Sequence, residues 1–144
     1  MNWYLKVLKE YVTFTGRARR KEFWMFTLFH LIIVSILVSL IVLSSDGFFS
    51  ARYSSEPQAP SIFLIILLVL YILGTFLPGL AVTVRRLHDT NKSGWWYLIS
   101  FVPYIGSFII LIFTCMDSYP RQNQWGENPK GIGNNSLIDQ IGTE

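Results

Sequence analysis

A polar stretch between two apolar runs decides the fold: residues 62–96 read IFLIILLVLYILGTFLPGLAVTVRRLHDTNKSGWW. Residues 62–84 carry no charge, and they are long enough to cross a bilayer, because a spanning helix needs about 20 apolar residues. At residue 85 the pattern changes to two arginines, a histidine, an aspartate and a lysine, followed by two tryptophans. This boundary predicts a spanning helix that ends at the membrane surface, where arginine and indole side chains meet the head groups.

The composition is typical of a membrane protein. Hydrophobic residues make up 51% of the 144 residues and charged residues 15%, against about 25% charged in an ordinary soluble domain. The net charge is +3, but the cations flank apolar runs instead of forming a separate basic domain, so we expect no nucleic-acid partner. The single cysteine excludes an intrachain disulfide and a cysteine-rich zinc site. We predict no metal site and no cofactor.

Two further runs, 23–43 and 95–116, are also long enough to span. Pro103 and Gly106 interrupt the last of them, and a proline removes a helix hydrogen bond and kinks the chain. We therefore predict an all-α membrane protein with about three transmembrane helices, the third kinked or re-entrant at Pro103. We favour the kinked span, which would place the tail outside; a re-entrant hairpin would return the tail to the cytoplasm.

The rest of the chain divides around this transmembrane domain of residues 23–116. Residues 1–22 form a basic segment in which aromatic and aliphatic residues recur at helical spacing over positions 1–15, a pattern typical of an amphipathic helix that lies in the membrane interface. Residues 44–60 form a loop, and residues 117–144 form a turn-rich polar tail.

The distribution of basic residues predicts the orientation. Residues 1–22 carry six lysines and arginines, the 44–60 loop carries one, and the loop that follows residue 84 carries three. Since basic residues gather on the cytoplasmic side, we expect a cytoplasmic N-terminus and an external first loop.

Two basic clusters with aromatic neighbours, TGRARRKEFW at 15–24 and RRLHDTNKSGWW at 85–96, would then face the cytoplasm together. One interpretation is that they only fix topology. The other is that they bind anionic lipid or a partner protein, a homo-oligomer included. The candidate binding residues are Arg17, Arg19, Arg20, Arg85, Arg86, His88, Asp89, Trp95 and Trp96. Because an unpaired acid at the membrane boundary is costly, we also expect Glu22 to pair with Arg85 or Arg86. Of these two we select Arg86.

These clusters favour a non-enzymatic membrane protein, and we predict no catalytic residue. One alternative is an oligomeric small transporter or channel component, motivated by the interrupted spans and by His30 within the first span. A second alternative is a membrane enzyme that uses His88. His88 and Asp89 make a poor catalytic pair, however, because adjacent helix residues do not face each other, and no Gly-x-Ser-x-Gly or His-Glu-x-x-His motif occurs.

The motifs FTGRARRKEFW (14–24), VRRLHDTNKSGWW (84–96), the Pro103 and Gly106 pair and NQWGENP (123–129) resemble those of a family of small bacterial inner-membrane proteins, the domain of unknown function 805. The resemblance covers about residues 10–130. The tail departs from the family pattern, with Gln124 and Trp125 where a basic residue and a tyrosine are expected. The resemblance implies a bacterial inner membrane and a multi-span helical fold. It implies no activity, substrate or catalytic residue.

Overall fold

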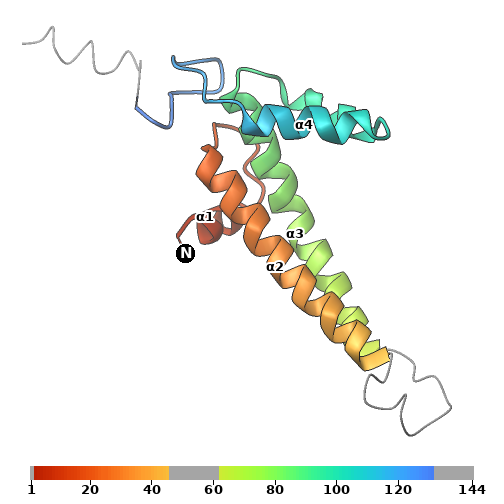
Figure 1. The fold of residues 1–144 in the computed structure, drawn as a ribbon. Coiled ribbons are helices and arrows are strands. Elements are labelled where there is room, and N and C mark those ends of the chain that lie inside the picture. The colour runs from red at the N-terminus through yellow and green to blue at the C-terminus, as the bar shows by residue number, and fades with distance from the viewer. Residues whose placement is uncertain (1, 46–61, 132–144) are drawn as a thin grey trace, which may run out of the picture. The chain divides into compact units, whose positions relative to one another are not determined.

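A computed structural model describes residues 2–45 and 62–131 (Figure 1). The elements in this part of the chain are α1 (Asn2–Lys9), α2 (Arg20–Ser45), α3 (Ile62–Asp89), a 3₁₀ helix η2 (Gly94–Phe101) and α4 (Ile105–Cys115). They belong to two compact units. Unit 1 comprises Met1–Phe26 and Pro78–Glu144, and unit 2 comprises Thr27–Leu77.

Among the described residues, α2 and α3 are the two helices long and apolar enough to cross a membrane. They contain the predicted spans 23–43 and 62–84, and at 1.5 Å per residue they are roughly 39 and 42 Å long. Both helices are apolar on every face along most of their length, which suits lipid better than a one-sided protein core. The predicted loop 44–60 lies almost entirely outside the described residues.

A Schellman motif ends α3 at the start of the polar loop. Asn91 adopts a left-handed conformation with φ 60°, the amide of Asn91 donates to His88 O at 3.0 Å, and the amide of Lys92 donates to Leu87 O at 3.0 Å. Asparagine tolerates this conformation better than most residues. Ser93 then caps η2 by accepting a hydrogen bond from the amide of Trp95.

The third predicted span is not a single helix. Residues 94–101 form the 3₁₀ helix η2, Tyr104 turns the chain with φ 63°, and α4 begins at Ile105. With 11 residues, α4 is about 16 Å long, roughly half of the hydrocarbon core. The chain therefore folds back at Pro103 into a helical hairpin, here called the η2–α4 hairpin. The sequence favoured a kinked span, and that prediction is corrected.

Gly106 allows the two arms of this hairpin to touch. A Cβ atom at position 106 would lie 1.8 Å from the carbonyl oxygen of Ile99, and backbone atoms cannot move aside as a flexible side chain can. We expect Gly106→Ala to open the hairpin and to lower the free energy of unfolding by about 1–3 kcal/mol or more, measured by equilibrium unfolding in mild detergent. Gly74→Ala is the control, because a Cβ there meets nothing within 4 Å; equal losses for both variants would contradict this packing.

The amphipathic helix α1 packs on protein. Val7 is fully buried in a small core with Ala18, Phe26 and Val82, and the ring of Tyr4 stacks on Phe26 with centroids 5.5 Å apart. The sequence predicted that this apolar face would rest in the membrane interface. The beginning of α2 and the end of α3 cover the part of this face around Val7, and contact of the remainder with the membrane interface stays a prediction.

Candidate functional site: a polar core at the end of α3

Asp89 lies at the centre of a buried polar core in unit 1. Its side chain is 0% exposed, and that of Arg17 is 1% exposed. Arg17 Nε donates to Asp89 Oδ1 at 2.9 Å, Arg86 Nη1 donates to Oδ2, and the hydroxyl of Ser118 donates to Oδ2 at 2.6 Å. One carboxylate thus serves two guanidinium groups, which leaves one positive charge in excess.

Backbone carbonyl groups balance this excess charge. Arg86 Nε donates to Thr114 O at 3.1 Å, and Arg86 Nη2 donates to Met116 O. These carbonyls belong to the last turn and the C-cap of α4, where a helix has no acceptor partners of its own and carries partial negative charge. Arg86 therefore fixes the end of α4 against the end of α3.

Arg17 fixes the tail in the same way. Arg17 Nη2 donates to Tyr119 O at 2.7 Å, and Arg17 Nη1 donates to Arg121 O at 2.8 Å. The amide of Tyr119 in turn donates to Asp89 O at 2.8 Å. Three segments far apart in sequence, 16–22, 85–92 and 114–128, therefore meet in one polar core.

A second group of charges lies beside α1. Glu22 is 1% exposed, and it accepts from Lys6 Nζ at 2.9 Å and lies 3.2 Å from Arg85 Nη1. Arg85 Nη1 also pairs with Glu10. Glu22 therefore pairs with one of the two arginines that the sequence proposed. Its partner is Arg85, and the selection of Arg86 is corrected, because Arg86 pairs with Asp89.

His88 and Asp89 do not act on each other in the described structure. The ring of His88 stacks on Trp125 with centroids 4.5 Å apart, and Nδ1 lies 3.3 Å from Gly16 O. Asn123 Nδ2 also donates to His88 O at 2.8 Å. The tail residues Ser118, Asn123 and Trp125 were absent from the predicted site. The motif NQWGENP was the signal that could have included Asn123 and Trp125, whereas Ser118 lies outside it.

The candidate binding residues therefore divide into buried and exposed sets. Arg17, Arg85, Arg86, His88 and Asp89 are buried, so their side chains hold the protein together and are not free for a lipid head group. Trp95 and Trp96 are exposed, and Lys92 lies over the rings of Trp96 and Phe113, 5.6 and 4.4 Å from their centroids. Arg19 and Arg20 are partly exposed.

Arg20 and Asp117 lie at the edge of the polar core. Arg20 Nε donates to Met116 O at 2.5 Å and lies 4.0 Å from Asp117 Oδ1. The hydrogen bond from Lys130 and that from the amide of Ser118 lower the pKa of the exposed Asp117 carboxyl. Within the described ranges no three His, Cys, Asp or Glu residues gather closely enough to hold a metal ion.

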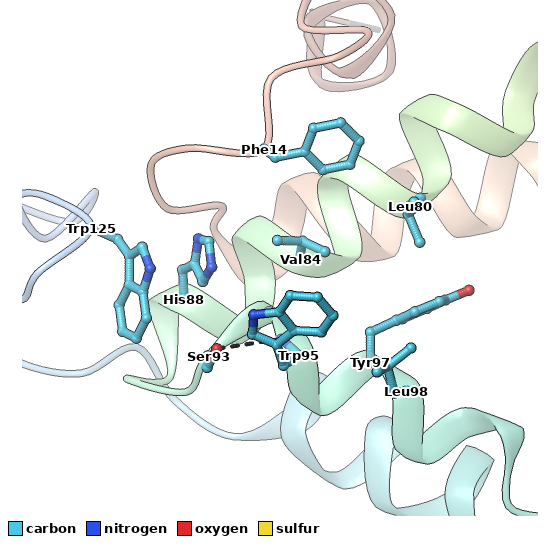
Figure 2. Close-up of a pocket in the computed structure, with 10 residues that line it drawn as sticks. Phe14, Leu80, Val84, His88, Ser93, Trp95, Tyr97, Leu98 and Trp125 are labelled. Carbon is cyan, nitrogen blue, oxygen red and sulfur yellow. Dashed lines mark hydrogen bonds between the residues drawn. The ribbon is translucent and has the colours of Figure 1, made fainter.

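A pocket of about 430 Å³ opens next to the polar core. Figure 2 shows Leu80, Val84 and His88 of α3 on one side and Tyr97 and Leu98 of η2 on the other. The remaining lining residues are Phe14, Ser93, Gly94, Trp95 and Trp125.

Long apolar helices joined to a buried polar core of arginines define the class: an all-helical membrane protein. The chain belongs to the family described as "Protein of unknown function (DUF805)", whose profile matches residues 11–127. It is 45% identical to inner membrane protein YhaI of Escherichia coli K12 over 131 residues, which cover 90% of this chain and 97% of YhaI. It is 44% identical to inner membrane protein YhaH of the same strain over 130 residues, 90% of this chain and 98% of YhaH. No solved structure matches. The expected family and the inner-membrane location are thereby confirmed.

Proposed function

We propose that this chain is a non-enzymatic, multi-pass inner-membrane protein whose cytoplasmic face binds anionic phospholipid. The charge distribution carries the proposal. The described residues of unit 1 hold eleven lysines and arginines against five aspartates and glutamates, whereas the described residues 27–45 and 62–77 hold no charged residue. An excess of cations at one end of two apolar helices is the pattern of a cytoplasmic face.

The η2–α4 hairpin supports attachment of this face to the membrane surface. Its apolar side chains are largely exposed, Tyr104 at 96% and Trp95 at 78%, and such a surface is stable only in contact with lipid or protein. Both ends of the hairpin lie at the C-terminal end of α3, as the bond from Arg86 to Met116 O shows. We therefore assign the hairpin to the inner leaflet and the tail to the cytoplasm.

Three cations within residues 2–26 remain available for head groups. Lys9, Arg19 and Lys21 are at least partly exposed, and their side chains make no ion pair within the described part of the chain. Lys21 lies one turn before the exposed Trp24 on α2, which places a cation and an indole on the same helix face. Each cation near an anionic surface contributes about 1 kcal/mol.

The experiment is the relative affinity of the reconstituted protein for phosphatidylglycerol over phosphatidylcholine, measured by quenching of tryptophan fluorescence with brominated forms of each lipid. We expect a preference for phosphatidylglycerol that is largely lost in the triple variant Lys9→Gln, Arg19→Gln, Lys21→Gln and that weakens with salt. Lys130→Gln is the control, because Lys130 is already paired with Asp117. Equal quenching of the wild type by both lipids would contradict the proposal.

A further inference from the structure

We infer that the pocket beside His88 binds the head group of a neutral quinol with an apolar tail. This inference concerns a site and a ligand other than the cationic face and its phospholipids. The pocket holds about 430 Å³, room for one substituted ring and the first part of a chain. Leu80 and Leu98 lie at one end, together with the hydroxyl of Tyr97, and His88 and Ser93 lie at the other (Figure 2).

The lining excludes a charged ligand. None of its ten residues is aspartate, glutamate, lysine or arginine, and the nearby guanidinium groups of Arg17 and Arg86 are already bonded to Asp89 and to backbone carbonyls. A charged group of the ligand would therefore find no counterion in this lining. The ligand is therefore neutral.

His88 presents a hydrogen-bond acceptor to the ligand. Nδ1 lies 3.3 Å from Gly16 O, and because a carbonyl oxygen can only accept, Nδ1 carries the proton of the neutral ring. Nε2 is then an acceptor. Nε2 faces the lining residue Gly94, where a Cβ would lie 3.3 Å from it. The head group that fits this end of the pocket carries a hydroxyl donor.

The aromatic walls select a flat head group. Phe14, Trp95, Tyr97 and Trp125 all line the pocket, and aromatic faces stack favourably on another ring. A quinol combines a flat ring, hydroxyl donors, no charge and an apolar tail. The tail would exit the pocket past Leu80 and Leu98. The inference is limited to binding.

The test measures binding of a decyl-tailed benzoquinol to the full chain in detergent by thermophoresis, under anaerobic conditions. The same compound in its oxidised form is the matched ligand, because its ring oxygens can only accept. We expect the quinol to bind about tenfold more tightly than the quinone, the effect of about one hydrogen bond. His88→Phe keeps an aromatic ring against Trp125 and should abolish this difference.

A second pair of variants makes the test independent of His88. Leu98→Trp fills the pocket and should weaken quinol binding at least tenfold. Leu111→Trp is the control, because Leu111 belongs to the same hairpin and does not line the pocket, and its exposed fraction is 49% against 52% for Leu98. Equal weakening by both variants, or equal affinity for quinol and quinone, would overturn the inference. If dioctanoylglycerol, a hydroxyl lipid without a ring, bound more tightly than the quinol, the assignment of the ligand as a quinol would be overturned. None of these results depends on the preference for phosphatidylglycerol, so the two proposals fail separately.

Discussion

Replacing Asp89 by alanine is expected to lower the free energy of unfolding by about 3–5 kcal/mol, the usual cost of removing one partner from a buried ion pair. The reason is that Arg17 and Arg86 both lose their carboxylate while they remain buried. The hydroxyl of Ser118 also loses its acceptor. Equilibrium unfolding of the purified protein in mild detergent measures this loss.

Asp117→Ala is the matched control for Asp89. Asp117 also pairs with a cation, Lys130, but its side chain is 66% exposed. Solvent screens such a pair, so we expect Asp117→Ala to unfold as the wild type does. If Asp89→Ala were as stable as Asp117→Ala, Asp89 would not be the centre of the polar core.

Arg17→Ala is expected to release the tail as well as to destabilise the fold, by about 3–5 kcal/mol for the same reason. Arg17 is the side chain that joins Asp89 to the carbonyls of Tyr119 and Arg121. Arg17→Lys should recover only a small part of the loss, because a lysine ammonium cannot reproduce the fork of donors that a guanidinium offers. Limited trypsin digestion reports the effect directly, with faster cleavage after Arg121.

Arg19→Ala is the control for Arg17, since Arg19 lies two residues away and is partly exposed. We expect no change in its unfolding or in the cleavage rate at Arg121. Equal protection of the tail in Arg17→Ala and Arg19→Ala would show that other contacts hold the tail.

Sequence alone predicted the two long helices because length and uniform apolarity are sufficient evidence for a span. The third run, 95–116, has the same composition, so composition could not distinguish a kinked span from a hairpin. The difference rests on long-range contacts: the close approach of Gly106 to Ile99 O and the bonds from Arg20 and Arg86 to Met116 O. No local pattern encodes these contacts.

The candidate site was predicted in part for a similar reason. The two basic clusters do come together in unit 1, but their sequence does not show which cations face inward. Neighbouring residues such as Arg85 and Arg86 point about 100° apart on a helix, and only the rotation of α3 assigns Arg85 to Glu22 and Arg86 to Asp89. The choice of Arg86 for Glu22 was wrong because that rotation cannot be read from the sequence.

The side of the membrane on which the tail lies tests the central claim most directly. The polar core requires residues 117–131 to share a compartment with residues 16–22, so the η2–α4 hairpin must not cross the bilayer. C-terminal fusions to alkaline phosphatase and to a fluorescent protein distinguish the two topologies, and the same reporters inserted within residues 46–61 serve as the external control. We predict fluorescence and no phosphatase activity at the C-terminus, together with phosphatase activity at the insertion. An active C-terminal phosphatase would mean that residues 95–116 span the membrane, and it would contradict the polar core around Asp89.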